Sequence, residues 1–245
     1  MKYIEIENLS VSYSGKRMKR ALRGLNLTVD KGHIYGFLGP NGAGKTTAIK
    51  TMIGLIPEYE GKVLIFGKAP TDLSSKYKIG FMPEIANYYW YLTPKELLNM
   101  YAQIFDMDKK QTSAKIEELL DLVDLKDASN SLMKTFSKGM MQKVSFAQAL
   151  INDPELLILD EPTGGLDPLS RIKMRDVIKG LQRKGKTILF SSHELSEVET
   201  ICDEVAIIKE GTLLRSGKLA PLLAEKGSSI TLERYFLDII GGQYI

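Results

Sequence analysis

The feature that most restricts the fold of this chain is a glycine-rich run: Gly39-Pro40-Asn41-Gly42-Ala43-Gly44-Lys45-Thr46. The run matches the phosphate-loop pattern G-x-x-x-x-G-K-[ST] without a gap. Glycines let backbone N–H groups converge on an anion, Lys45 can reach the β- and γ-phosphates, and the Thr46 hydroxyl can ligate Mg²⁺. An apolar stretch expected to be a strand, 33–38, precedes the run, and a helical pattern, 46–54, follows it. This order predicts a nucleoside triphosphate site at a helix N-terminus, rather than a chance glycine-rich turn.

Length and composition narrow the class of protein. With 245 residues, of which 44% are hydrophobic, the chain can bury one large core or two small ones. The net charge of +3 is too small to indicate a nucleic-acid partner, and the basic stretch Lys16–Arg20 is expected to be a solvated hairpin tip. The single cysteine, Cys202, excludes an internal disulfide, suits a reducing compartment and, with only His33 and His193, leaves no zinc cluster.

Hydropathy predicts no membrane-spanning segment. No apolar run approaches the roughly 20 residues that a span requires, and we see no signal-peptide pattern at the start of the chain. We therefore expect any contact with a membrane to go through a partner.

Hydrophobic periodicity predicts an α/β fold with a mostly parallel sheet and two additions. The segments 2–13 and 21–29 are β-rich and form an N-terminal antiparallel part. From Ile34 strands and helices alternate, which is typical of a parallel sheet covered on both faces. A helical block interrupts this alternation at about 84–150, and a tail at about 217–245 carries two short helix patterns. We treat 1–245 as one nucleotide-binding domain. The expected later strands are 62–66, 78–82, 155–159, 187–191 and 204–208, and the expected helices of the block are 94–105, 112–125 and 138–150.

A second apolar strand ends in two acids. Four aliphatic residues, 156–159, precede Asp160 and Glu161. Ligands gather at the carboxyl ends of such strands, so Asp160 is predicted to hold Mg²⁺ and Glu161 to polarise the attacking water as general base. The phosphate loop makes this interpretation stronger than that of a simple turn acid.

Two further positions are predicted to contact phosphate. His193 follows the strand 187–191 and two serines, where it can donate a hydrogen bond to the γ-phosphate or the attacking water. Ser137 opens the helix 138–150 as a good N-cap, with free N–H groups beside it. Ser137 is either an ordinary cap or a second anion site, and its place shortly before Asp160 favours the anion site.

In this order, the motifs closely resemble those of the nucleotide-binding subunit of ATP-binding cassette (ABC) transporters, over nearly the whole chain. The residues that carry the resemblance are Gly39–Thr46, Phe136–Met140 in the signature position, Asp160-Glu161, Gly164–Asp167 and Ser191–His193. The S-K-G-M form of the signature is most similar to the exporter-type subgroup.

The resemblance implies a P-loop NTPase that hydrolyses Mg-ATP, with Lys45, Glu161 and His193 in catalytic roles. It also implies a head-to-tail dimer, in which the phosphate loop of one subunit, extended to Thr47, and the signature helix of the other enclose each ATP. Ser137 and Gly139 would then bind the γ-phosphate held by the partner.

Two more residues match family positions. Tyr13 matches the aromatic residue that stacks on adenine, although a strand tyrosine packed on a neighbour is the alternative. Asp167 matches the acid that communicates across the dimer interface.

Three positions depart from the family pattern. Lys138 and Met140 replace the glycine and glutamine of the common L-S-G-G-Q signature. Glu84 stands where many members carry a glutamine near Mg²⁺ and water, and its oxygens remain suitable metal ligands. His33 stands where an acid is usual, and the sequence alone offers no physical account of it.

The partner is predicted to be an integral membrane permease on a separate chain. The aromatic run 88–91 either receives a helix of this permease or packs beneath its own loop, and the sequence leaves both open. The resemblance implies a cytoplasmic subunit, peripheral to the membrane, with no direct membrane insertion and no nucleic acid partner. A cassette ATPase serving a soluble assembly complex, of the metal-cluster type, is the alternative. A regulatory subunit without turnover is disfavoured because Lys45, Asp160, Glu161 and His193 are intact.

Overall fold

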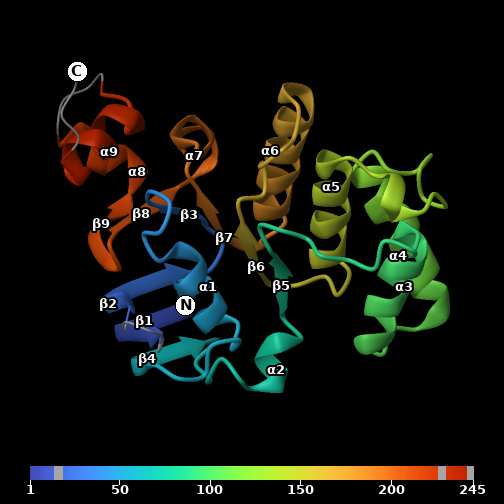
Figure 1. The fold of residues 1–245 in the computed structure, drawn as a ribbon, viewed down its shortest axis with the longest axis horizontal. Coiled ribbons are helices and arrows are strands. Elements are labelled where there is room, and N and C mark those ends of the chain that lie inside the picture. Colours follow the sequence, from blue (N-terminus) through green and yellow to red (C-terminus); the bar gives the residue numbers. More distant parts are fainter. Residues whose placement is uncertain (14–18, 226–229, 242–245) are drawn as a thin grey trace. The chain divides into compact units, whose positions relative to one another are not determined.

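The computed structural model describes residues 1–13, 19–225 and 230–241, which fall into two compact units (Figure 1). Unit 1 comprises Met1–Lys76 and Thr187–Ile245, and unit 2 comprises Tyr77–Lys186. Most of the predicted basic hairpin tip, 16–18, and the predicted break in the tail, 227–229, lie outside the described residues. The single-domain boundaries remain a prediction; unit 2 contains the segment predicted as the helical block.

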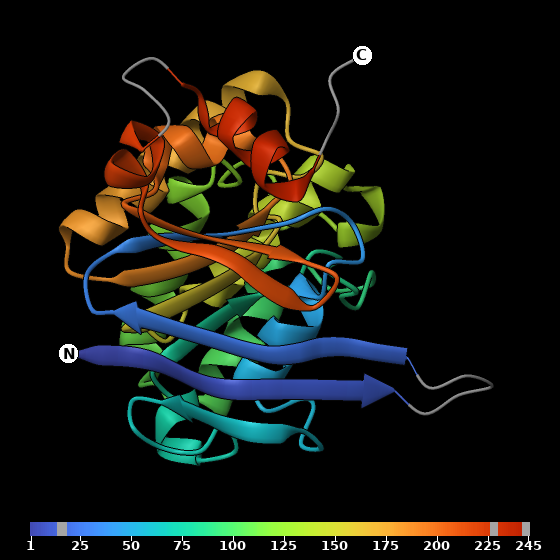
Figure 2. The same ribbon diagram turned by 90° about the vertical axis from the view of Figure 1, so that its left-hand side faces the viewer.

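The first sheet of unit 1 is antiparallel and has the order β2-β1-β4. Its strands are β1 (Lys2–Tyr13), β2 (Lys19–Asp30) and β4 (Glu60–Ile65). Figure 2 shows β1 and β2 running side by side along most of their length. The predicted N-terminal antiparallel part is thereby confirmed. The placement of β4 with the parallel strands was wrong, because β4 returns to pair antiparallel with β1, with Ile6 opposite Val63.

The second sheet of unit 1 places β3 between two parallel neighbours. Its strands are β3 (Ile34–Leu38), β7 (Thr187–Ser192), β8 (Glu204–Lys209) and β9 (Thr212–Lys218). β3 pairs in parallel with β7 and β8, and all five of its residues are buried, which explains its uninterrupted apolar sequence. β9 pairs antiparallel with β8 and was not predicted, because its arginine, serine, glycine and lysine give a weak strand pattern.

The described residues of unit 1 also form five helices. They are α1 (Lys45–Met52), α2 (Leu73–Lys76), α7 (Leu195–Ile201), α8 (Leu219–Ala224) and α9 (Leu232–Ile240). Helix α7 packs on β3, β7 and α9. Gly36 in β3 permits this packing, because a Cβ there would lie 2.7 Å from Val198 Cγ1 and 2.9 Å from Cys202 Sγ.

Unit 2 consists of a parallel strand pair and a set of helices. The strands are β5 (Ile79–Met82) and β6 (Leu156–Asp160), and the helices are α3 (Pro94–Ile104), α4 (Lys109–Leu122), η1 (Met133–Thr135), α5 (Lys138–Ala149) and α6 (Pro168–Arg183). Helices α3, α4 and α5 pack against one another, and no strand interrupts residues 83–150, as predicted (Figure 1).

The start of each helix in this block follows from its cap. Thr93 and Glu96 form a capping box at α3, which begins where predicted. Helix α4 begins three residues before the predicted Thr112, because the Asp108 carboxylate accepts from the N–H groups of Lys110 and Gln111. None of the helices in the described ranges is long and apolar enough to cross a membrane.

Candidate nucleotide site

The phosphate loop joins the buried strand β3 to α1. Gly42 and Gly44 adopt positive φ angles of 79° and 108°, and Gly44 is the residue before the first turn of α1. A Cβ on Gly44 would lie 2.8 Å from the Ala21 carbonyl oxygen, so this position requires glycine for space as well as for conformation. The loop therefore presents backbone N–H groups at the N-terminus of a helix, which is a ready site for phosphate.

Lys45 is held inside the loop. Its side chain is buried, and Nζ donates to the Gly39 carbonyl oxygen at 2.7 Å. The ammonium group is thus already positioned over the loop, where it neutralises an anion bound there.

Tyr13 lies at the end of β1, on the same unit as the loop. Its hydroxyl is 3.3 Å from Thr47 Oγ1, and the residue is 43% exposed. The ring is therefore not packed away in the core, and its place beside Thr47 is compatible with stacking on a base.

His193 follows β7, also in unit 1. Ser191 and Ser192 are buried, whereas His193 is exposed. The Ser192 hydroxyl accepts from the Glu194 backbone N–H at 2.9 Å, which fixes the turn that carries the histidine. The strand and this turn set the position of His193 at the carboxyl end of β7.

In unit 2, β6 ends in the two predicted acids, both of which are buried. Asp160 is 2% and Glu161 8% exposed. Glu161 has a positive φ of 53°, a conformation that costs a non-glycine residue on the order of 1 kcal/mol. Its carbonyl oxygen accepts from Gln142 Nε2 at 2.9 Å and from the Gly164 N–H at 3.1 Å. These bonds hold the backbone of Glu161 in its left-handed conformation directly after the strand.

Gln142 was missed in the sequence. It is 3% exposed and lies one turn beyond Lys138 in α5, directly after the motif around Ser137. The sequence shows only a glutamine close to an expected anion-binding helix end. Its partner, the Glu161 carbonyl oxygen, is 19 residues away along the chain, so the contact could not be seen.

Ser137 is the N-cap of α5. Its Oγ accepts from the Met140 N–H at 3.2 Å. A Cβ on Gly139 would lie 3.2 Å from the Gly165 carbonyl oxygen, and the Lys138 side chain lies over Gly165, where a Cβ would be 2.8 Å from its Cδ. Lys138 therefore packs its aliphatic part on the Gly164–Asp167 turn, which gives this departure from the common signature a structural reason.

Asp167 caps α6. Its Oδ1 accepts from the N–H groups of Leu169 at 3.1 Å and Ser170 at 3.0 Å. Hydrogen bonding to Ser170 lowers the pKa of this carboxyl, which keeps Asp167 ionised.

The aromatic run divides into one packed and three exposed residues. Tyr88 hydrogen-bonds through its hydroxyl to Ser145 Oγ at 3.1 Å and Gln148 Oε1 at 3.0 Å, and burial raises its pKa. Tyr89, Trp90 and Tyr91 are 54%, 70% and 61% exposed. Tyr88 is therefore packed locally, whereas the other three rings are exposed, with the ring centroids of Tyr89 and Tyr91 5.6 Å apart. Glu84, just upstream, is exposed.

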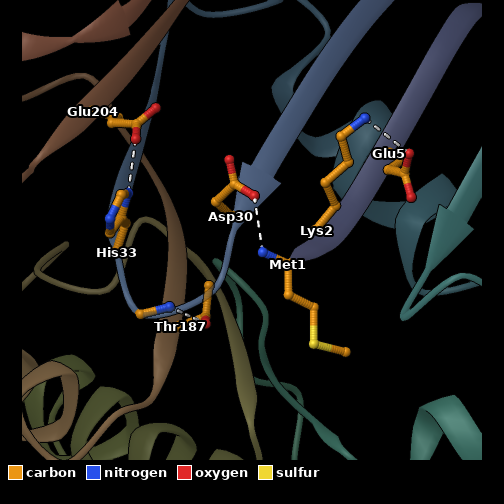
Figure 3. A network of polar contacts seen from close by, with 8 residues as sticks. Met1, Lys2, Glu5, Asp30, His33, Thr187 and Glu204 are labelled. Atoms are coloured by element: carbon orange, nitrogen blue, oxygen red, sulfur yellow. Dashed lines mark hydrogen bonds and ion pairs between the residues drawn. The ribbon is translucent and has the colours of Figure 1, made fainter.

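His33 has a partner that explains its presence. Its Nδ1 lies 2.7 Å from Glu204 Oε1, joining the residue before β3 to the first residue of β8 (Figure 3). The same edge is fixed by a bond from the Gly32 N–H to Thr187 Oγ1 at 2.8 Å, and Glu204 also contributes to the raised pKa of buried Tyr35. The contact between His33 and Glu204 thus joins the start of β3 to the start of β8 within unit 1.

The geometry of the loop and of the two buried acids defines an α/β nucleotide-binding protein of the P-loop class. Comparison with known proteins gives the family: the family model described as ABC transporter matches residues 22–164, more than half of the chain. The chain therefore belongs to the ABC transporter family, as one of its ATP-binding subunits.

The relatives extend over most of the chain. An uncharacterized ABC transporter ATP-binding protein of Nostoc sp. is 48% identical over 85% of this chain and 63% of its own length. The fluoroquinolones export ATP-binding protein of Mycobacterium tuberculosis strain H37Rv is 38% identical over 86% of this chain and 69% of its own length. The chain thus spans about two thirds of the length of these relatives.

Two solved structures show the same fold. The structure of an ATP binding subunit of an ABC transporter is 30% identical with a TM-score of 0.88, covering 97% of this chain and 99% of the other. A dimeric ATP-binding cassette in a post-hydrolysis state, bound to ADP and Pi, is 27% identical with a TM-score of 0.81, covering 88% of this chain and 98% of the other.

Proposed function

We propose that this chain hydrolyses ATP and drives transport through a separate membrane permease. The observation that carries the proposal is the buried Glu161, held at a strained backbone position directly after β6, on a chain with a complete phosphate loop. Among the described non-glycine residues with a positive φ, Glu161 is the one that is buried, and a buried acid held in such a conformation is a candidate functional residue.

Each residue of the proposed site has its own role in ATP hydrolysis. The loop N–H groups and Lys45 bind the β- and γ-phosphates, Glu161 accepts a proton from the attacking water, and His193 donates a hydrogen bond to the γ-phosphate or that water. Thr46 in unit 1, and Asp160 and Glu84 in unit 2, each carry the kind of hard oxygen ligand that Mg²⁺ prefers, and we assign them to the metal. When bound, Mg²⁺ neutralises charge on the phosphates. In the described ranges no group of three His, Cys, Asp or Glu side chains could hold a metal ion.

The second half of each ATP site comes from a second subunit. Ser137 and Gly139 open α5 with free N–H groups, and Asp167 opens α6. The related cassette bound to ADP and Pi is dimeric, which supports a second subunit. We propose that the pair is head-to-tail, with Ser137 and Gly139 on the γ-phosphate held by the partner.

The exposed aromatic residues are the permease contact. Backbone hydrogen bonds from Leu92 N to Tyr89 O at 2.9 Å and from Lys134 N to Trp90 O at 2.8 Å fix this segment while its rings remain exposed. A rigid exposed aromatic surface suits a protein partner, because little ordering entropy is lost on binding. The subunit then works at the cytoplasmic face of the membrane, and the name of the fluoroquinolones export relative favours export.

The catalytic part is tested with Glu161→Gln. This variant should bind Mg-ATP normally, lose phosphate release and sediment as a dimer with ATP, because the amide cannot accept the proton. Glu210→Gln is the matched control, since Glu210 is exposed and has a similar φ of 49°. Normal phosphate release by Glu161→Gln would exclude Glu161 as the base.

The docking part is tested by pull-down with the co-expressed permease. Tyr89→Ala combined with Trp90→Ala should weaken the association, whereas Tyr88→Phe should not. Equal recovery of the permease by the double variant would refute the contact. Failure of the chain to co-purify with any integral membrane protein would favour a soluble assembly complex instead.

A further inference from the structure

Two adjoining cavities lie in unit 2, lined by residues that none of the nucleotide motifs uses. The first, here the α4–α6 cavity, has a volume of about 400 Å³ and is lined by Leu119, Leu122, Val177, Gly180 and Leu181, among others. The second, here the aromatic cavity, measures about 380 Å³ and includes Tyr77, Phe105 and Met107. Lys115 and Asp153 line both cavities, so the two meet at this pair of residues. Each volume falls in the range of small-molecule sites.

Gly180 keeps the first cavity open. It lies within α6, where glycine is less favourable than alanine, and a Cβ there would meet only Arg183 Nη2 at 3.8 Å. Close packing therefore does not require the glycine, and its φ is not in the left-handed region. The missing side chain widens the cavity.

Two lysines that line the cavities are more buried than the carboxylates they pair with. Lys115 pairs with Glu118 at 3.1 Å, and Lys186 pairs with Asp153 at 2.8 Å. The lysine side chains are only 22% and 16% exposed, whereas their carboxylate partners are 59% and 75% exposed. Lys115 and Lys186 are thus the more buried members of their pairs, and Lys186 Nζ also donates to the Asp153 carbonyl oxygen at 3.0 Å. Asp176 and Lys184, which also line the α4–α6 cavity, are exposed. A partly buried ammonium with a solvated partner gains most from an anion that enters from the cavity.

We propose that these cavities bind a small amphipathic carboxylate. Its apolar body lies against Leu119, Leu122 and Leu181 in the α4–α6 cavity, and its anionic group lies between Lys115 and Lys186. The site lies at the C-terminal half of α6, whose N-terminus carries Asp167. At about 1.5 Å per residue, it is on the order of 20 Å from that end of the helix. None of the residues assigned to ATP lines either cavity.

The test measures binding of decanoate to the whole chain by calorimetry, with decanol as the neutral analogue. Decanoate should bind saturably with one molecule per chain, and decanol at least about tenfold more weakly, as expected for loss of a hydrogen bond between charged groups. Lys115→Gln should weaken decanoate binding by a similar factor. Lys179→Gln is the matched control on α6, because Lys179 does not line either cavity.

Filling the cavity provides an independent test. Gly180→Leu should abolish decanoate binding, while Gly180→Ala should raise the melting temperature by about 2–4 °C through helix propensity. A melting curve of each variant checks that the fold is retained, so that a loss of binding can be distinguished from a loss of structure.

Four results would each overturn the proposal: no saturable binding of decanoate, equal affinity for decanol, normal binding by Lys115→Gln, or normal binding by folded Gly180→Leu. Binding to vesicles of anionic phospholipid without binding to free decanoate would also reject it, and would indicate a membrane-surface contact. None of these measurements involves ATP hydrolysis, so their outcome is independent of the proposed function.

Discussion

Ser137 has two roles that substitutions can separate. Its Oγ accepts from the Met140 N–H at 3.2 Å and caps α5, and the same hydroxyl is proposed to donate to the γ-phosphate held by a partner subunit. A hydroxyl can do both at once, because accepting uses a lone pair and donating uses the hydrogen.

The size of each effect follows from these bonds. Ser137→Ala loses the cap, which costs about 1 kcal/mol and lowers the melting temperature by about 2–4 °C for a chain of this size. It also loses a hydrogen bond to a charged group, worth about 1.5–3 kcal/mol, so ATP turnover should fall by roughly 10- to 100-fold. Ser137→Asp keeps a good cap, but an ionised carboxylate has no hydrogen to donate, whereas Ser137→Thr keeps both functions.

The assay compares melting curves with steady-state phosphate release at saturating Mg-ATP. We expect Ser137→Asp to restore stability but not turnover, and Ser137→Thr to restore both. Normal turnover of Ser137→Asp would refute the phosphate contact and leave Ser137 as a cap alone. Normal turnover of Ser137→Ala would refute it as well.

Three further predictions concern stability. The pKa of the Asp124 carboxyl is lowered, chiefly by a hydrogen bond from Lys173 Nζ at 2.7 Å. The ionised carboxylate therefore stabilises the fold at neutral pH, and this contribution is lost as the pH falls below about 4. With Asp124 48% exposed, Asp124→Asn should lower the free energy of unfolding by only about 0.5–1 kcal/mol at pH 7, and denaturant titrations should show the difference disappearing in acid. Gly80→Ala should cost about 1–3 kcal/mol in the same titrations, because its Cβ would overlap the Ala149 carbonyl oxygen, and an unchanged midpoint would contradict that crowding. Tyr88→Phe should cost about 1–2 kcal/mol by losing both hydroxyl partners while leaving permease association intact; reduced association would assign Tyr88 to the contact.

Much of the fold could be predicted because its signals are local. The strand 2–13 was placed with its observed bounds, and the helices at Pro94 and Lys138 begin where their caps, Thr93 and Ser137, predict. Start signals of this kind involve residues three or four apart, so the sequence displays both partners together.

The sequence by itself located the phosphate loop, since Gly39–Thr46 is one continuous run, and it located most of the strands, but not β9 or the antiparallel pairing of β4. Tertiary structure decided how distant residues meet. It pairs His33 with Glu204, 171 residues away, fixes the Glu161 carbonyl through Gln142, returns β4 to β1, and brings Lys115 and Asp153 to one pair of cavities. The physical reason is range: backbone conformation is set by near neighbours, whereas burial, charge pairing and cavities depend on contacts that exist only after the chain has folded.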